Sequence, residues 1–367
     1  MARLGVGLIG TGFMGKAHAL AFSAAASVFD LDRRPHLAVL ADADARRAEA
    51  CAERWGFEAS TGDWRALIAE PRVEVVAITT PNHLHAEMAL AALAAGKAVY
   101  CEKPMATGLA DARRMAEAAR GRRTLLGYNY LRGPAIGLAK SMIAAGELGE
   151  IVAFKGRFAE DYMADPAVPH SWRCVRALAG SGALGDLGSH LIGFALHLVG
   201  EVQAVSGEVS TVIAERSTAR GKAPVENDDQ VHAVLRFANG ARGVIDISRV
   251  AWGYKNHLAV EITGTKGTLA FNQERLNELR LFRKGDAGFA TILAGPQHPP
   301  YGAFSPAAGH QLGYGDLKTA EVGHLLAGLA GSDALYPNFA AGLVIERIAA
   351  AIERASTERR WVDLAEL

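Results

Sequence analysis

The stretch that decides the fold of this chain is LGVGLIGTGFMG, residues 4–15. Its first half is a short apolar run, which is typical of a strand buried inside a parallel sheet. Gly10, Gly12 and Gly15 follow in a G-x-G-x-x-G pattern, at the point where a helix is predicted to begin. The first glycine permits a tight turn, the second lets the backbone approach a pyrophosphate, and the third lets helix and strand pack closely. The stretch therefore predicts a dinucleotide-binding turn, with cofactor contacts from Gly10, Thr11, Gly12, Phe13, Met14 and Gly15.

The rest of the first third of the chain alternates short apolar runs with helical segments. Strands are predicted at residues 4–10, 37–41, 73–79, 98–101 and 124–127, and helices at 14–26, 43–55, 63–69, 83–95 and 109–120. Strict alternation indicates βαβ units, and hence a parallel sheet with right-handed crossovers. We therefore predict an α/β Rossmann domain with a doubly wound parallel sheet over residues 1–127.

The pattern changes after residue 127. Helices are predicted at 134–145 and 187–199, and strands at 202–212, 230–237, 241–247, 257–263, 267–272 and 278–282. Asn239-Gly240 and Lys266-Gly267 are hairpin signals. A segment rich in glycine and proline, 295–315, precedes two further helices at 318–330 and 339–356. We predict an α+β domain with a large open, mostly antiparallel sheet over residues 128–367, whose final helices are candidates for packing back on the first domain.

Composition excludes several classes of protein. The 367 residues include 39 basic and 39 acidic side chains, so the formal net charge is zero and no basic face for nucleic acid is expected. Cys51, Cys101 and Cys174 lie far apart, which argues against a disulfide framework or a zinc site. The apolar N-terminal run is too short for a signal peptide, and no stretch approaches the ~20 apolar residues of a membrane span. We expect a cytoplasmic chain with no membrane segment.

Asp42 ends the second predicted strand, where an acid accepts hydrogen bonds from the ribose hydroxyls of a dinucleotide. Its distance from Gly15 slightly exceeds the usual spacing of about 20 residues, and residues 30–35 account for the excess. A carboxylate here would repel a 2′-phosphate, so NAD is favoured over NADP. Two alternatives remain open: Asp42 as a solvated turn or capping residue, and Arg46 and Arg47 as partners of a phosphate.

Other candidate cofactor contacts follow later strands. Thr80, Asn82 and His85 come directly after the strand at 73–79, and Glu102 ends the strand at 98–101. The carboxyl ends of parallel strands form the edge at which ligands bind in open α/β sheets. Asn82 is also a plausible helix N-cap. His83 and His85 would project to different faces of a helix, so we expect no metal site there.

Four motifs together identify a family. The glycine turn at 10–15, Thr80-Pro81, Glu102-Lys103-Pro104 and Asp186-Leu187-Gly188-Ser189-His190 occur in this order. In this the chain resembles, over nearly its whole length, the glucose–fructose oxidoreductase, inositol dehydrogenase and rhizopine-catabolism family. The resemblance implies a Rossmann domain followed by an open sheet domain that binds substrate and often builds dimers or tetramers. It also implies that Lys103 lies between nicotinamide and substrate, with its backbone fixed by Pro104, since an X-Pro bond can adopt the cis form.

Asp186 and His190 are four residues apart on a predicted helix and therefore share a face. An imidazole with an ordinary pKa of about 6.5 can accept the proton of an alcohol near neutrality. Asp186 would orient His190 or bind a substrate hydroxyl; without the family resemblance, a helix cap and a core histidine would be the simpler interpretation. A metal pair at this spacing lacks a third ligand, so no metal is expected. Relatives often have an acid three residues after the histidine, where this chain has Gly193, which places the substrate specificity in doubt.

Further substrate contacts are sought around these motifs. Arg157 and Tyr162 lie on or after a strand, Trp172-Arg173 supply an aromatic and a charged wall, and Asn129 follows the last Rossmann strand. Several of these residues would equally suit a domain or subunit interface. His310 lies in a loop that either folds over the site as a lid or simply connects two elements.

The resemblance implies an NAD-dependent dehydrogenase that oxidises a secondary alcohol of a cyclic polyol, inositol or sugar, or reduces the corresponding ketone. Two alternatives within the family are a glycoside hydrolase that uses bound NAD for transient oxidation, and a non-catalytic NAD-responsive regulator. Because the open sheet needs covering, we expect a homodimer or homotetramer formed through the C-terminal sheet.

Overall fold

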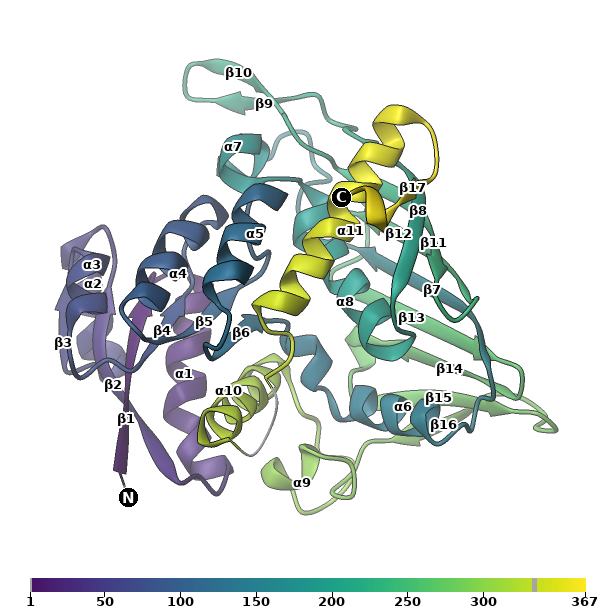
Figure 1. The fold of residues 1–367 in the computed structure, drawn as a ribbon, viewed down its shortest axis with the longest axis horizontal. Coiled ribbons are helices and arrows are strands. Elements are labelled where there is room, and N and C mark those ends of the chain that lie inside the picture. Colours follow the sequence, from purple (N-terminus) through teal and green to yellow (C-terminus); the bar gives the residue numbers. More distant parts are fainter. Residues whose placement is uncertain (1, 332–334) are drawn as a thin grey trace. The chain divides into compact units, whose positions relative to one another are not determined.

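A computed structural model describes residues 2–331 and 335–367, and it divides the chain into two compact units (Figure 1). Unit 1 comprises Met1–Arg132 and Gly313–Val344, and unit 2 comprises Gly133–Leu312 and Ile345–Leu367. The division after Arg132 lies slightly beyond the predicted boundary at residue 127. The segment Gly313–Val344 returns to unit 1, so the second domain is not the uninterrupted stretch 128–367.

Unit 1 is built on a parallel sheet of six strands in the order β3-β2-β1-β4-β5-β6. The strands are β1 (Ala2–Ile9), β2 (Arg33–Ala41), β3 (Ala59–Thr61), β4 (Val75–Ile78), β5 (Ala98–Glu102) and β6 (Thr124–Gly127). The connecting helices are α1 (Phe13–Val28), α2 (Ala45–Trp55), α3 (Trp64–Ala69), α4 (His85–Ala94) and α5 (Leu109–Ala118), with short 3-10 turns η1 (Asn82–Leu84) and η2 (Asn129–Arg132). The predicted doubly wound sheet is confirmed.

Helix α10 (Tyr314–Ala330) completes the core of unit 1, although it lies far along the sequence. It packs against α1, as Figure 1 shows by the yellow-green and purple helices. Val322 and Leu325 of α10 share one buried cluster with Phe22 of α1 and Val6 of β1. The apolar run of β1 is buried for the same reason as in other parallel sheets, because helices cover both of its faces.

Unit 2 contains a nine-stranded sheet in the order β16-β15-β14-β13-β7-β12-β11-β8-β17. Only β7 and β12 pair in parallel, so the predicted open, mostly antiparallel sheet is confirmed. Its strands are β7 (Ile151–Ala159), β8 (Val202–Ser210), β11 (Gln230–Phe237), β12 (Arg242–Ser248), β13 (His257–Gly264), β14 (Gly267–Asn272), β15 (Glu278–Arg283), β16 (Ala290–Leu293) and β17 (Val362–Asp363). A separate hairpin pairs β9 (Glu215–Thr218) with β10 (Gly221–Pro224).

The remaining elements of unit 2 are mostly helical. They are α6 (Pro134–Ala144), the 3-10 turn η3 (Trp172–Cys174), α7 (Arg176–Ala179), the π-helical turn η4 (Leu184–Gly188), α8 (Ser189–Leu198), the 3-10 turn η5 (Gln273–Arg275), α9 (Tyr301–Phe304) and η6 (Leu364–Glu366). Helix α11 (Phe339–Glu358) begins in unit 1 and ends in unit 2.

Helix α8 covers one face of the large sheet. Phe154 and Phe158 of β7 are buried on this face, and a β-carbon on Gly156 would lie 3.0 Å from Leu191 of α8. Lys155 and Arg157 alternate with them and so point to the opposite face. The face that carries α8 is therefore distinct from the outer face of the sheet, and this distinction decides where the predicted site residues lie.

Two structural details depart from the sequence-based expectations. The short strands β3, β9, β10, β16 and β17 were not predicted, because two to four residues carry too little periodicity to stand out. The helix predicted at 187–199 is preceded by the π-helical turn η4, which contains Asp186. In addition, none of the helices in the described residues is long and apolar enough to cross a membrane.

Candidate functional site

The glycine turn after β1 has the geometry of a dinucleotide-binding loop. Gly10 has a φ of 106°, which favours glycine, and a β-carbon on Gly15 would lie 2.1 Å from the carbonyl oxygen of Gly10. A β-carbon on Gly12, by contrast, would meet no atom within 4 Å. Gly12 therefore leaves room at the N-terminus of α1, where no side chain of the described residues caps the helix. These features fit a pyrophosphate at that position.

Asp42 is the second predicted contact with the cofactor. Its Oδ2 atom accepts hydrogen bonds from Thr11 through the backbone N at 3.0 Å and Oγ1 at 2.6 Å, and Arg47 Nη2 lies 2.7 Å from Oδ1. Burial alone would raise the pKa of Asp42, but hydrogen bonds from Thr11, Asp44 and Arg47 hold it below the ordinary value. The ionised carboxylate is thus fixed beside the glycine turn, and the exposed side chain of Arg47 is the partner most easily displaced by ribose hydroxyls.

The turn after β4 contains Thr80, Asn82 and His85. The ring of His85 is buried, with Nδ1 at 2.9 Å from the carbonyl oxygen of Pro104 and Nε2 at 2.9 Å from that of Thr80. His85 therefore ties this turn to the segment that follows Lys103, and no ring nitrogen remains for a cofactor, contrary to the predicted contact. Thr80 is half-buried, with Oγ1 at 3.6 Å from Met88 Sδ, and half-buried Asn82 begins η1.

Lys103 follows β5 directly, is half-buried, and forms a cis peptide bond with Pro104, as the resemblance suggested. Its neighbour Glu102 was predicted to contact the cofactor. Instead, Glu102 Oε1 lies 2.8 Å from Lys318 Nζ and 2.6 Å from His18 Nε2, and only 5% of the residue is exposed. The backbone N of Lys103 lies 3.4 Å from Glu102 Oε2. The carboxylate of Glu102 is therefore turned into the interior, where it supports the backbone of Lys103.

Glu102 belongs to a buried cluster of five titratable side chains, which we call the His18–Lys318 cluster: His18, Tyr100, Glu102, Lys318 and Glu321. Lys318 Nζ lies 2.7 Å from Glu321 Oε2 and 3.2 Å from the hydroxyl of Tyr100, which also donates to Glu321. No local sequence pattern points to this cluster, because it joins α10 to β5 and α1.

The protonation states within the His18–Lys318 cluster follow from burial and pairing. Burial and the charge of Lys318 lower the pKa of His18 to about 4, so its ring is neutral at pH 7. Burial would raise the pKa of Glu102, but Lys318 and His18 hold it well below the ordinary value. Burial would lower the pKa of Lys318, which Glu102 and Glu321 instead raise. Burial also raises the pKa of Glu321. The cluster therefore centres on a Glu102–Lys318 ion pair.

Two further residues of unit 1 flank the glycine turn or the end of the sheet. Tyr314, the first residue of α10, lies against exposed Phe13 with the ring centroids 5.7 Å apart and the rings tilted by 34°, and its hydroxyl lies 3.1 Å from Met14 Sδ. It lies beside the segment that was predicted as a lid or connecting turn. Asn129 is 3% exposed, and its Nδ2 has no hydrogen-bond partner within the described part of the chain. A buried donor of this kind fits contact with a ligand.

In unit 2, the π-helical turn η4 and helix α8 carry Asp186 and His190. The hydroxyl of Tyr162 donates a hydrogen bond of 2.9 Å to Asp186 Oδ2, which brings these two predicted residues together. Burial, followed by the carboxylate of Asp186, raises the pKa of Tyr162 well above its ordinary value, so the hydroxyl remains a donor. His190 is 5% exposed, and its ring lies against Phe158 at a centroid distance of 5.9 Å. Gly193 is buried within α8.

Arg157, Trp172 and Arg173 are further predicted substrate residues of unit 2. Arg157 lies on the outer face of the sheet, with Nε at 3.1 Å from Asp246 and Nη1 at 3.1 Å from the hydroxyl of Tyr254. Because Phe158 contacts His190 on the opposite face, the structure separates Arg157 from His190, contrary to the predicted shared site. The guanidinium of Arg173 lies 4.6 Å from the ring centroid of Trp172.

His310 lies in the loop between α9 and α10. It is exposed, and its Nδ1 lies 3.0 Å from Ser305 Oγ within its own loop. The described residues contain no group of three or more histidine, cysteine, aspartate or glutamate side chains that would hold a metal ion.

Comparison with known proteins bears on both units. A family model described as an oxidoreductase family with an NAD-binding Rossmann fold matches residues 4–130, and a GFO/IDH/MocA C-terminal domain model matches residues 136–270. The chain belongs to the GFO/IDH/MocA family of oxidoreductases. Membership confirms the predicted family and the predicted cofactor, since unit 1 is an NAD-binding Rossmann domain.

Individual relatives within the GFO/IDH/MocA family differ in how much of the chain they match. The levoglucosan dehydrogenase of Pseudarthrobacter phenanthrenivorans is 41% identical over 100% of both chains. The inositol 2-dehydrogenase of Gluconacetobacter diazotrophicus is 38% identical over 41% of this chain and 44% of its own.

Solved structures of family members are also similar. A levoglucosan dehydrogenase in complex with NADH and L-sorbose has a TM-score of 0.96 at 42% identity, covering 99% of both chains. An NAD binding oxidoreductase from Klebsiella pneumoniae has a TM-score of 0.95 at 47% identity, also covering 99% of both chains.

Proposed function

We propose that this oxidoreductase oxidises a secondary alcohol on the ring of a cyclic polyol, sugar or glycoside with NAD, or reduces the corresponding ketone. The observation that carries the proposal is the extent of the similarity. The match to levoglucosan dehydrogenase spans both units at 41% identity, whereas the match to inositol 2-dehydrogenase spans 41% of the chain. Levoglucosan, the sugar in the first relative's name, is therefore the leading candidate substrate, ahead of inositols.

The chemistry is divided among three side chains. Bound NAD supplies a hydride acceptor at its nicotinamide ring. Lys103 donates a hydrogen bond to the reacting oxygen and stabilises the negative charge that develops there. His190 accepts the hydroxyl proton during oxidation and returns it during reduction. Asp186, with one oxygen held by Tyr162 at 2.9 Å, orients the substrate hydroxyl or His190.

NAD is preferred over NADP in this proposal because of Asp42. Its ionised carboxylate lies at the carboxyl end of β2, where it would repel a 2′-phosphate and accept hydrogen bonds from ribose hydroxyls. If the ribose hydroxyls replace Arg47 as the hydrogen-bond partner of Asp42, both carboxylate oxygens of Asp42 remain paired. Replacement of Asp42 by Ala should weaken NAD binding and reduce the difference in affinity between NAD and NADP.

We also propose that the outer face of the large sheet joins copies of the chain into a homodimer or homotetramer. Val234 and Val244 pair directly across β11 and β12 on this face, and 39% and 51% of these residues are exposed. Apolar side chains that are adjacent and exposed favour burial against a partner. Replacement of both valines by Lys should lower the mass measured by analytical ultracentrifugation, and an unchanged mass would contradict the interface.

The function is tested by following NADH absorbance with purified protein, NAD and a panel of levoglucosan, inositols, monosaccharides and glycosides. We expect NADH to accumulate with levoglucosan or a few related rings, and NADPH to form more slowly when NADP is the acceptor. The Lys103→Met variant should lose turnover but still bind NADH, as measured by fluorescence. Unchanged turnover in this variant would refute the role of Lys103.

If no compound of the panel produces NADH, the proposed dehydrogenase activity is refuted. Cleavage of a glycoside without net NADH would then support the hydrolase alternative. NAD binding without any change in the sugars would support the regulator.

A further inference from the structure

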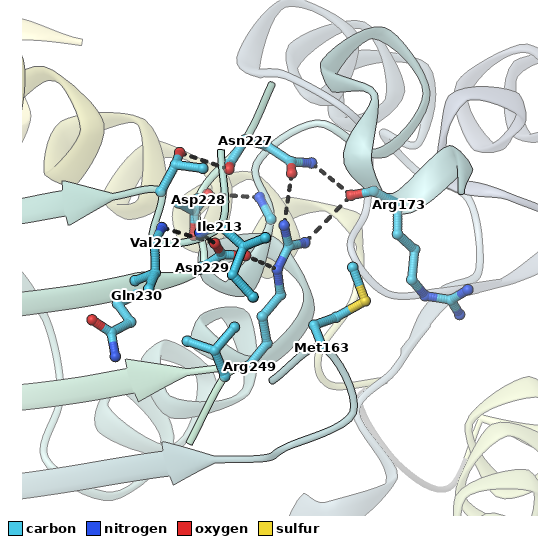
Figure 2. Close-up of polar contacts among 12 residues, drawn as sticks. Met163, Arg173, Val212, Ile213, Asn227, Asp228, Asp229, Gln230 and Arg249 are labelled. Atoms are coloured by element: carbon cyan, nitrogen blue, oxygen red, sulfur yellow. Dashed lines mark hydrogen bonds and ion pairs between the residues drawn. The ribbon is translucent and has the colours of Figure 1, made fainter. Parts of the chain in front are cut away.

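A buried polar network of unit 2 adjoins the segment that carries Asp186 (Figure 2). Its members are Asn227, Asp228, Asp229 and Arg249, of which 2%, 3%, 0% and 1% are exposed. We call it the Asn227–Arg249 network. Charged side chains are rarely buried so completely unless they are paired and hydrogen-bonded. Nothing in the sequence motifs points to these residues, so their contacts must indicate their role.

Asp228 holds the start of the turn that contains Asp186. Its Oδ1 accepts a hydrogen bond from the backbone N of Gly182 at 2.6 Å, and its Oδ2 accepts one from Leu184 at 2.7 Å. The carbonyl oxygen of Asp228 accepts a third from Ala183 at 2.9 Å. Three consecutive N–H groups, which η4 itself cannot satisfy, are thus bound by one residue. The path of the backbone into Asp186 is therefore set by Asp228.

Gly182 makes this close approach possible. A β-carbon at Gly182 would lie 2.0 Å from the carbonyl oxygen of Asp228 and 2.8 Å from Arg249 Nη1. No side chain fits between the two segments. The glycine-rich approach to Asp186 is explained by contact with the network.

The residues on either side of Asp228 are held by Arg249. Nε of Arg249 lies 2.9 Å from Asp229 Oδ1, and Nη2 lies 2.9 Å from Asn227 Oδ1. Asp229 Oδ2 also accepts hydrogen bonds from the backbone N of Val212 at 2.8 Å and of Ile213 at 2.9 Å. Figure 2 shows the guanidinium between Asn227 and Asp229. Because both neighbours are fixed, Asp228 has little freedom to shift relative to the turn.

The same network also anchors the two other segments that carry predicted substrate residues. The carbonyl oxygen of Arg173 accepts hydrogen bonds from Asn227 Nδ2 at 2.9 Å and from Arg249 Nη1 at 3.3 Å. The backbone N of Met163 donates to the carbonyl oxygen of Arg249 at 3.1 Å. Met163 directly follows Tyr162, which donates to Asp186. The segments that carry Tyr162, Arg173 and Asp186 therefore share one buried support.

We propose that Asp228, clamped by Arg249 through Asn227 and Asp229, is a positioning residue that holds Asp186 and His190 in the geometry required for proton transfer. This inference rests on the proposed function. A displacement of about 1 Å at reacting groups can reduce turnover about 100-fold. Loss of Asp228 should therefore act on the chemical step, while NAD binding, which belongs to unit 1, should be unaffected.

The test uses Asp228→Asn in the full-length protein. The amide keeps the volume of the side chain but turns one acceptor into a donor, which would face an N–H group of Gly182 or Leu184. We expect kcat to fall about 10- to 100-fold, with the Kd for NADH within a factor of about two. The primary deuterium isotope effect on kcat should rise as the chemical step becomes rate-limiting. A purely structural role would lower the unfolding temperature without changing kcat or the isotope effect of the folded protein.

The matched control is Asp286→Asn. Asp286 is also a carboxylate of unit 2 that accepts a backbone hydrogen bond, from Arg283 at 2.8 Å, but it lies in an exposed turn. Its substitution should leave all of these readouts at wild-type values. Asn227→Ala is the milder second variant, which keeps the charges and should lower kcat by a smaller factor. Wild-type kcat in folded Asp228→Asn, or in Asn227→Ala if the first variant does not fold, would overturn the inference.

Two readouts do not require turnover and so separate this inference from the proposed function. In Asp228→Asn, hydrogen exchange should be faster in the peptide covering residues 180–188, and the NMR signals of the His190 ring, assigned with His190→Gln, should move because the turn before α8 is no longer held. If the wild-type protein oxidises no sugar, the proposed function fails, and these readouts still decide the role of Asp228. Unchanged His190 ring signals would then overturn it, even if the exchange is faster.

Discussion

The two buried polar assemblies of this protein support different predicted catalytic groups by different means. The His18–Lys318 cluster of unit 1 lies next to Lys103, and its side chains bond mainly to one another. The Asn227–Arg249 network of unit 2 lies next to Asp186, and many of its bonds go to backbone N–H and carbonyl groups. The first is a set of coupled titratable groups, whereas the second fixes the path of the backbone. Buried charged side chains can thus serve either to set one another's ionisation or to fix the backbone. We expect the two assemblies to respond differently to mutation and to pH.

The largest effect is expected from Lys318→Met, which breaks the His18–Lys318 cluster. The substitution leaves Glu102 and Glu321 buried without their cation, and uncompensated buried charges cost about 3–5 kcal/mol of unfolding free energy. Urea unfolding measures this loss. The matched control is Lys155→Met, which removes an exposed pair with Glu261 and should cost less than about 1 kcal/mol. Equal losses in the two variants would contradict the buried ion pair.

The next effect is a pH dependence of stability that arises from His18 of unit 1. Folding lowers the pKa of His18 from 6.5 to about 4, so between these values the unfolded chain binds a proton that the folded protein does not. The contribution of His18 to the unfolding free energy should therefore fall by about 3 kcal/mol as the pH decreases from 6.5 to 4. Above pH 6.5 this contribution should not change with pH.

His18→Gln is the variant that isolates this effect. In this variant the unfolding free energy, measured by urea unfolding across the pH range, should fall less steeply below pH 6.5 than in the wild type. His232→Gln, a substitution on the exposed outer face of unit 2, should leave this fall unchanged. Parallel wild-type and His18→Gln curves would show that the ring is not buried as a neutral group.

Arg249→Lys sharpens the contrast with unit 2. Lysine keeps the charge beside Asp229 but loses the fork that reaches Asn227 and the carbonyl of Arg173, which should cost about 1–3 kcal/mol. Because both side chains stay protonated, we expect the same loss at pH 6 and pH 8. Arg242→Lys, whose exposed guanidinium donates to the carbonyls of Gly240 and Ala241, is the control and should cost less. A loss that depends on pH would place this network in the same class as the His18–Lys318 cluster.

The smallest effect is expected from Tyr162→Phe. Loss of one hydrogen bond to Asp186 is worth about 1 kcal/mol, so kcat/KM should fall about fivefold with the Kd for NADH unchanged. Tyr254→Phe removes a hydroxyl that bonds Arg157 on the outer face and should leave kcat/KM unchanged. If both tyrosine variants behave alike, Tyr162 does not act through Asp186.

The predicted site rests on local signals in the sequence. The glycine turn, Asp42, Lys103 and the Asp186–His190 spacing each carry their chemistry within a few residues or at a fixed place after a strand. Arg157 was wrongly grouped with His190 because a strand pattern gives alternation but not which face meets which helix. The side chains of Glu102 and His85, predicted to contact the cofactor, instead bond to residues remote in the sequence, which no local pattern reveals.

The sequence by itself determined the Rossmann sheet, the mostly antiparallel second sheet, the NAD-binding turn and the family, because periodicity and motifs depend on neighbours along the chain. Only the tertiary structure decided that α10 returns to unit 1, that Lys318 neutralises Glu102, and that Asp228 and Arg249 hold the turn before Asp186. These are contacts between segments that are far apart in the sequence. Their hydrogen bonds and ion pairs exist only once burial has excluded water and brought the segments together.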